Sequence, residues 1–279
     1  MKKRTRYLFA AALAVCLILS VCVCLMTSAA DDSSGSCGEK VTYKLSNGTL
    51  TVSGTGAMNS YSENGVPWAP ARSRITKVVV ETGVTSVGYY AFADCPSLTS
   101  VTLAATVTDI GRFAFANCEK LNGVVLPDGL KTLGSHAFLN CKALTAITVP
   151  EGVTVLSPSV FDGCSALADV TLPSGLKTVG ASAFEDCSSL VSLRIPDNTE
   201  SVGAYAFENC VSLTALRVHA SVASLGEKVF NGCSSSLVVT CPKGSATDLY
   251  CNAANITVRH EGLSEGGSDP EPGEWSPWF

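Results

Sequence analysis

The stretch AFANC at residues 114–118 decides the fold, because the same pattern returns along the chain at a fixed step of 23 residues. Its copies are AFADC at 91–95, AFLNC at 137–141, VFDGC at 160–164, AFEDC at 183–187, AFENC at 206–210 and VFNGC at 229–233. A fixed period between about 20 and 50 residues is typical of a solenoid, in which each unit buries its apolar side only against its neighbours. The sequence therefore predicts a stack of similar coils.

Each unit combines two apolar spacings. In AFANCEKLNGVVL at 114–126 the apolar residues follow a helical spacing as far as Leu121, and Val124 and Leu126 then alternate as in a strand. Turns follow the strands, as in PDG at 127–129 and PEG at 150–152. We therefore expect each coil to contain a short helical turn, a strand and a tight turn.

Stacked coils would place the repeated aromatic and thiol side chains in two internal files. Parallel strands lie about 4.8 Å apart, so equivalent side chains of neighbouring coils pack on one another. Burial of one phenylalanine contributes on the order of 1.5–3 kcal/mol, and most of the stability is expected here. The predicted structural ladder consists of Phe92, Phe115, Phe138, Phe161, Phe184, Phe207 and Phe230 with Cys95, Cys118, Cys141, Cys164, Cys187, Cys210 and Cys233.

The repeat resembles a known family. An L-x-x-L-x-L pattern, with cysteine three residues ahead and segments such as IGRFAF at 110–115 before it, is similar to the 23-residue leucine-rich repeat of BspA-like surface proteins, over roughly 75–260. The resemblance implies a right-handed α/β repeat solenoid with a parallel β-sheet on one face and short helical turns on the other. The unit LSPSVFDGC departs from the motif, with Ser157 in place of glycine and Pro158 next to it, and a local kink is expected there.

The chain divides into five segments. We expect a signal peptide at 1–30, an N-terminal β cap at 31–74, the repeat array at 75–240, a C-terminal cap at 241–260 and an acidic Pro/Gly tail at 261–279. The first cap contains a predicted hairpin around Asn47-Gly48, because apolar residues alternate on both sides of this dipeptide. The second cap is expected to form a short helix from about Ser245 and a strand at 256–258.

The N-terminus predicts export. Four basic residues precede an apolar run from Leu8 to Met26, which small residues follow, as in a secretory signal. The run is also nearly long enough for an uncleaved membrane anchor, and a lipoprotein signal is a third alternative. All three place the remaining chain outside a bacterial cell, secreted or at the surface.

The charge excludes some partners. Without the signal, 15 basic residues stand against 24 acidic ones, a net charge of −9, so a nucleic-acid partner is not expected. Five of the acids lie in the tail 261–279, which has no Lys or Arg and ends in aromatic residues at 275, 278 and 279. This tail is either an exposed aromatic tag or a spacer that leads to a membrane or cell-wall tether.

The cysteines favour packing over chemistry. Ten remain after the signal, but Cβ atoms on adjacent coils would lie about 4.8 Å apart, farther than the mean of about 3.8 Å in a disulfide. We therefore interpret the seven ladder cysteines as buried thiols. A bridge between Cys241 and Cys251 stays open as an alternative. No metal site is expected, because this part of the chain has no C-x-x-C and its histidines do not cluster.

No catalytic residue or cofactor is predicted. GLSEG at 262–266 matches the G-x-S-x-G of serine hydrolases, but no histidine follows it and a linker-like composition surrounds it. GTG at 54–56 lacks the third glycine of a phosphate-binding loop. The chain is therefore not expected to be an enzyme.

A binding surface is the alternative to a catalytic site. Strand residues between the buried ones would face outward along the concave sheet, where Arg194 and Arg217 form one basic step able to meet a carboxylate or sulfate. The predicted ligand-binding file is Thr102, Val125, Thr148, Thr171, Arg194 and Arg217. The same file is also what an exposed sheet looks like, since β-branched residues favour strands. Aromatic residues such as Tyr89 and Phe113 lie instead near the convex turns, which provide a second candidate surface.

The resemblance implies adhesion or recognition, because BspA-like proteins are associated with attachment to host or neighbouring-cell components. The expected partner is an extracellular protein or glycan. A structural spacer that holds the chain or another module away from the cell wall is the second hypothesis. The outward residues do not indicate a particular ligand, so the identity of the ligand stays open.

Overall fold

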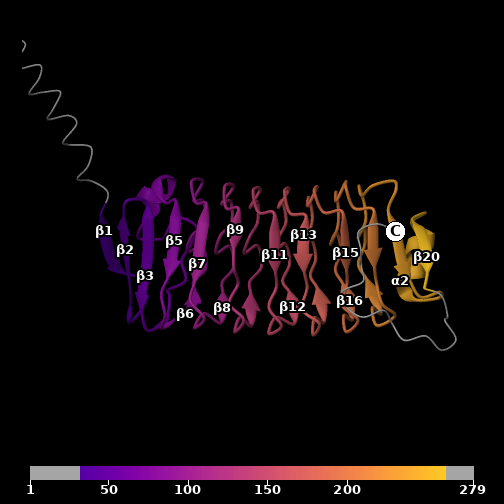
Figure 1. The fold of residues 1–279 in the computed structure, drawn as a ribbon, viewed down its shortest axis with the longest axis horizontal. Helices are drawn as coiled ribbons and strands as arrows, with labels where there is room; N and C mark the ends of the chain where they lie inside the picture. Colours follow the sequence, from indigo (N-terminus) through magenta and orange to yellow (C-terminus); the bar gives the residue numbers. More distant parts are fainter. Residues whose placement is uncertain (1–31, 262–279) are drawn as a thin grey trace, which may run out of the picture.

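A computed structural model describes residues 32–261 as a stack of coils that follow one another in sequence order along the long axis (Figure 1). The predicted signal at 1–30 and the tail beyond residue 261 lie outside the described residues. Within the described part, no helix is long and apolar enough to cross a membrane. The predicted parallel-strand solenoid is confirmed.

One row of strands forms the main sheet, in the upper half of Figure 1. Neighbouring coils pair in parallel at a step of 23 residues, so that Val78 lies beside Val101 and Arg194 beside Arg217. The hydrogen-bonded ladder is interrupted after β9 and after β13. The strands that the coils contribute are β5 (Lys77–Val80), β7 (Ser100–Leu103), β9 (Gly123–Val124), β11 (Ala146–Thr148), β13 (Asp169–Thr171), β15 (Ser192–Arg194), β17 (Ala215–Arg217) and β19 (Val238–Cys241).

A second row of shorter strands forms the minor sheet, in the lower half of Figure 1. It also pairs in parallel at a step of 23 residues, as between Val179 and Val202. The sequence did not predict this row. Its strands are β4 (Gly56–Ala57), β6 (Val84–Val87), β8 (Asp109–Ile110), β10 (Thr132–Leu133), β12 (Val155–Leu156), β14 (Thr178–Val179), β16 (Ser201–Val202) and β18 (Ser224–Leu225).

The expected face of short helical turns is not found. Helices in residues 32–261 are confined to the 3₁₀ helix η1 (Ala69–Arg74) and α2 (Ala246–Ala253). The AF segments are turns, because each coil contains two residues with positive φ, such as Tyr90 at 56° and Asp94 at 55°. Their backbone N–H groups bond to the next coil, as from Phe92 N to Ala114 O at 2.8 Å, and not along a helix.

Glycine lets neighbouring coils approach at the end of the minor strands. Gly134 N bonds to Ile110 O and Gly180 N to Leu156 O, each at 2.9 Å, and a Cβ on Gly180 would lie 2.5 Å from that oxygen. In the unit LSPSVFDGC at 156–164, Ser157 occupies the position that glycine has in the neighbouring coils. Within the described chain, its bond to Leu133 is missing and the minor sheet separates between β10 and β12. The structure thus shows an interruption of the minor sheet at the unit where the sequence predicts a kink.

Three antiparallel strands precede the first coil: β1 (Ser33–Ser36), β2 (Val41–Ser46) and β3 (Thr49–Gly54). Strands β2 and β3 turn at Asn47 and Gly48, whose φ angles of 49° and 73° suit a type I′ turn. Strand β3 pairs in parallel with β5 and so continues the main sheet.

Helix α2 and β20 (Thr257–His260) follow the last coil. Ser245 caps α2, because its side chain accepts a bond from Asp248 N at 3.2 Å. The buried Asp248 carboxylate accepts bonds from Gly244 N at 2.8 Å and Asn252 Nδ2 at 2.9 Å. Strand β20 extends the main sheet in parallel with β19.

The close approach at glycine can be tested with alanine. Gly180→Ala is expected to lower the free energy of unfolding by about 1–3 kcal/mol, because its Cβ must push two coils apart. Gly175→Ala is the control, since nothing lies within 4 Å of a Cβ there. Urea unfolding followed by circular dichroism measures both. Equal unfolding midpoints for the two variants would contradict the close contact.

Candidate binding surfaces

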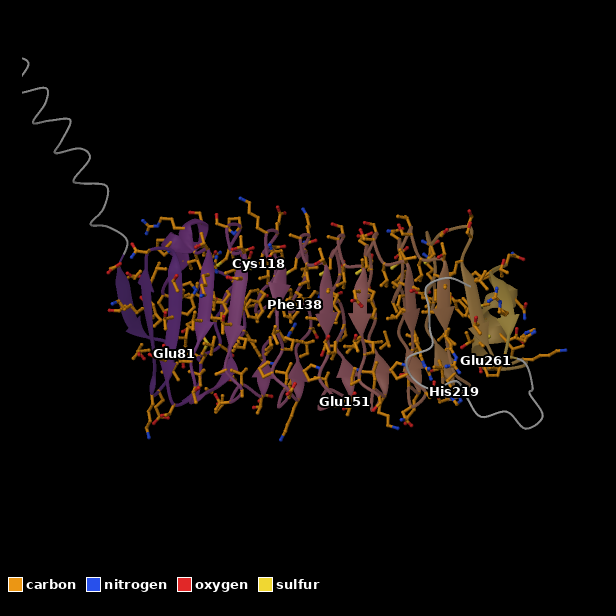
Figure 2. All side chains as sticks on the ribbon, in the orientation of Figure 1. Glu81, Cys118, Phe138, Glu151, His219 and Glu261 are labelled. Carbon is orange, nitrogen blue, oxygen red and sulfur yellow. The ribbon has the colours of Figure 1, made fainter. Side chains whose placement is uncertain are left out.

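The aromatic file forms a continuous core. Neighbouring phenylalanine rings stack with centroids 5.3–6.0 Å apart from Phe92 to Phe230. Trp68 extends the stack before Phe92 at 5.8 Å, and Tyr250 of α2 closes it edge-on against Phe230 at 5.9 Å. Phe138, labelled in Figure 2, is fully buried. These rings hold the stack together and leave no surface for a ligand.

The cysteine thiols bond to the coil before them. Cys118 Sγ donates to Phe92 O at 3.1 Å, and Cys141 Sγ to Phe115 O at 3.3 Å. The same bond recurs from Cys164, Cys187, Cys210 and Cys233. Burial raises the pKa of the Cys164 thiol to about 12, which disfavours the reactive thiolate. All ten described cysteines are free, including Cys241 and Cys251.

The predicted ligand-binding file lies on the outward side of the main sheet. Thr102, Thr148 and Thr171 are exposed, and Val125 is 83% exposed. Register places Thr148 beside Thr171 and Arg194 beside Arg217, so the residues follow one another from coil to coil. The face is made of short side chains that bear hydroxyl and methyl groups.

The two arginines of this file already have acidic partners. Arg194 Nη2 lies 2.8 Å from Asp197 Oδ2, and Arg217 Nε lies 2.6 Å from Glu261 Oε1. Glu261 is labelled at the C-terminal end of the stack in Figure 2. The basic step that the sequence suggested is therefore largely neutralised, and the file presents an almost uncharged surface.

A second surface follows the turns, which we call the turn ridge. It consists of the outward side chains of the segments 88–97, 111–120, 134–143, 157–166, 180–189, 203–212 and 226–235. Tyr90, Phe113 and His136 occupy one positive-φ column, and their rings stack with centroids 4.7 and 4.4 Å apart. Arg112 lies 5.9 Å from the Phe113 ring centre. Burial and the Arg112 charge lower the pKa of His136.

The other positive-φ column carries an amide ladder. Asn117 Nδ2 donates to Asp94 Oδ1 at 2.8 Å, and Asn140 Nδ2 to Asn117 Oδ1 at 3.0 Å. The ladder ends at Gly163, starts again at Asp186 and continues with Asn209. Asp and Asn tolerate the left-handed region better than most residues with a side chain, and Asp94, Asn117 and Asn140 adopt φ angles of 55°, 59° and 57°.

Most acidic residues of the ridge lie in its last four segments, whereas Asp94 and Glu119 of the first two segments form ion pairs with Arg72 and Lys142. Burial and the neighbouring Glu185 and Asp186 raise the pKa of Asp162 to about 6. Residues 32–261 contain no group of three His, Cys, Asp or Glu side chains that could hold a metal ion. The GLSEG segment at 262–266 lies outside the described residues.

Several of these residues escaped the sequence reading. Trp68 stands 24 residues before Phe92 and belongs to no AF motif, so its place in the stack carried no periodic signal. Neither Asp197 nor Glu261 was predicted to pair with an arginine, and Glu261 was assigned to the tail at 261–279. The ring column of Tyr90, Phe113 and His136 does follow the 23-residue step and could have been found from it.

Parallel coils, a buried leucine pattern and a cysteine file define a leucine-rich-repeat solenoid. The sequence matches the BspA type leucine rich repeat region in six copies, over residues 71–178 and 156–253. The chain belongs to this family of bacterial leucine-rich repeats. Neither the family nor the similar structures below carry the name of an enzyme.

Solved bacterial proteins share the fold. A leucine-rich repeat protein from Bacteroides ovatus is 22% identical with a TM-score of 0.58, over 80% of this chain and 66% of that protein. The T. pallidum leucine rich repeat protein TpLRR is 28% identical with a TM-score of 0.58, over 84% of this chain and 96% of that protein. The chain thus spans about two thirds of the B. ovatus protein. No curated protein matches the sequence.

Thiol alkylation tests the burial of the cysteine file. Cys164 is expected to resist iodoacetamide at pH 8, because its raised pKa leaves very little thiolate. Cys233 is half-buried with a pKa raised to about 11, and it should react first among the ladder thiols. Peptide mass spectrometry measures both, and unfolding in guanidinium provides the control. Equal rates for Cys164 in the folded and unfolded protein would contradict its burial.

The raised pKa of Asp162 predicts a pH dependence of stability. Between about pH 6 and pH 4 the folded protein holds this proton more tightly than the unfolded chain, so stability should rise as pH falls through this window. Asp162→Asn should stabilise the protein at pH 7.5 by about 1 kcal/mol, after allowance for screening at a half-exposed carboxyl. Thermal unfolding from pH 4 to pH 8 measures the effect, with Asp169→Asn on β13 as the control. A stability loss in Asp162→Asn would oppose this explanation.

Proposed function

We propose that the chain is an exported cell-surface protein that binds an extracellular protein or glycan in adhesion or recognition. The observation that carries the proposal is the outward file of the main sheet. It repeats exposed short side chains from coil to coil, with Val125 exposed at 83% in the middle of the file. Membership of the BspA-type family and the signal-like N-terminus support a place at the cell surface.

The chemistry of this file favours a neutral, extended partner. Arg194 and Arg217 are paired with Asp197 and Glu261, so an anionic ligand would have to displace these carboxylates. The threonine hydroxyls both donate and accept hydrogen bonds; Thr148 and Thr171 lie on adjacent coils, about 4.8 Å apart, and Thr102 lies two coils before Thr148. A polypeptide or glycan chain that runs along the stack can use several of them in turn. We place no nucleic acid among the partners, because the charge is negative.

The test is binding to immobilised matrix proteins, mucins and cell-wall polymers. Saturable binding is expected, and Thr148→Asp with Thr171→Asp should weaken it at least tenfold by placing two charges in the file. The matched control is Thr132→Asp with Val155→Asp, because Thr132 and Val155 are exposed on the minor sheet. Absence of saturable binding to any of these partners would refute adhesion. Equal losses from both double variants would refute the assignment to the main sheet.

A stiff spacer is the second candidate function. The observation that favours it is the unbroken aromatic stack from Trp68 to Tyr250, which ties all coils into one rod. A spacer needs length and does not need a particular surface. Its function should survive the Thr148 and Thr171 substitutions and should change when whole 23-residue units are removed.

A further inference from the structure

The turn ridge has opposite characters in its two halves. Its first three segments carry the stacked rings of Tyr90, Phe113 and His136, the 46% exposed Tyr89 and the exposed Arg112. No ion pair in residues 32–261 involves Arg112, whose guanidinium lies over the Phe113 ring. This half therefore offers aromatic surface and an available positive charge.

The last four segments carry most of the acids, and the two acids of the first three segments, Asp94 and Glu119, already form ion pairs with Arg72 and Lys142. In the ring column, Ser159 and Ser182 replace the aromatic residues. The acids are Asp162, Glu185, Asp186, Glu208 and Glu227, and within the described chain none of them forms an ion pair. One base, Lys228, belongs to this half, and it lies 5.6 Å from the Tyr205 ring centre. Like charges on adjacent coils repel, as the raised pKa of Asp162 reflects.

The boundary between the two parts of the ridge relates segments on its two sides: the three segments before it correspond to the first three after it, and the seventh segment, 226–235, has no counterpart. The boundary lies between the segments 134–143 and 157–166, where Ser157 interrupts the minor sheet. Arg112 lies one and a half coil spacings before this boundary and Glu185 lies one and a half after it. With a spacing of about 4.8 Å, a twofold axis at the boundary makes the two positions equivalent across an antiparallel pair of ridges.

We propose that two copies of this chain associate ridge to ridge, antiparallel, about this axis. The segment of Arg112 then faces the segment of the partner's Glu185, and the segment of His136 faces that of the partner's Asp162. The residues at the opposite positions are the half-buried Ala181 for Arg112 and the buried Ala116 for Glu185, and neither projects a long side chain, so Arg112 and Glu185 have room to pair diagonally. Tyr89 and Tyr90 face the segment of the partner's Tyr205.

A second copy fits this ridge better than an unrelated partner. A basic protein would cover the acidic half and leave the aromatic half open, whereas a second copy covers three segments on each side of the boundary with two identical contacts. Arg112 is exposed and Glu185 is half-buried, so solvent reaches the pair, and its electrostatic attraction weakens as salt screens it. Each main sheet stays free in this arrangement, so self-association is separate from the ligand binding proposed above.

The experiment uses thiol cross-linking in the full-length protein to test whether the same residue of two copies lies close together at the axis. In Ser135→Cys the new thiol lies about half a coil spacing from the axis, so two copies bring their thiols to about 5 Å along the ridge. A short bis-maleimide should cross-link them into a dimer at low salt. The matched control is Glu227→Cys, in the same column at the end of the ridge, where the two thiols would be about 34 Å apart. The parent protein gives the background of the native thiols.

Charge reversal in the Ser135→Cys protein completes the test. Arg112→Glu or Glu185→Arg alone should reduce the dimer yield at least tenfold, and both together should restore it, because the swapped charges meet again across the axis. Circular dichroism melts check that each variant is folded. Equal cross-linking of Ser135→Cys and Glu227→Cys would overturn the proposal. A double variant that cross-links as poorly as the single ones would overturn it too.

Discussion

Equal spacing of the coils is the constraint on which the structure depends. Backbone groups in the turns find their partners in the next coil, as Phe92 N does in Ala114 O at 2.8 Å, and equivalent bonds recur along the array. The phenylalanine rings and thiols can follow this spacing only if every coil has the same contour. At Ser157, where serine replaces the repeated glycine, the minor sheet is interrupted between β10 and β12, while the ring stack from Phe138 to Phe161 continues at 5.8 Å.

The period was enough to predict how the coils stack, but not the conformation inside each coil. Residues at i, i+1, i+4 and i+7 face one side of a helix, and they face the same side of a double turn with two left-handed residues. The residue types at Tyr90 and Phe113 did not predict a left-handed backbone, since bulky residues rarely adopt positive φ. Asp94 and Asn117 did indicate turns. The backbone hydrogen bonds between neighbouring coils favour the double turn over the helix, and these bonds cannot be identified from the sequence.

The ends were harder to predict than the array for the same reason. Trp68 takes the place of a phenylalanine from a segment with no repeat motif, and its Nε1 donates to Ala91 O at 2.9 Å. Tyr250 closes the other end from α2, and its hydroxyl accepts a bond from Val229 N at 2.8 Å. Terminal units of a solenoid must end the pattern instead of repeating it. Periodicity therefore carries little information about them.

The architecture allows the main sheet and the turn ridge to carry different surface chemistry. Since the repeated apolar residues are used up in the core, the sequence can vary outward side chains on the main sheet and on the turn ridge independently. The first face is nearly neutral and suits a neutral extended partner, whereas the second is divided into an aromatic, basic half and an acidic half. If the ridge joins two copies, their two main sheets belong to one rigid particle. A polymer that meets both would then be held by two sites, and weak contacts along each sheet would add up to durable attachment.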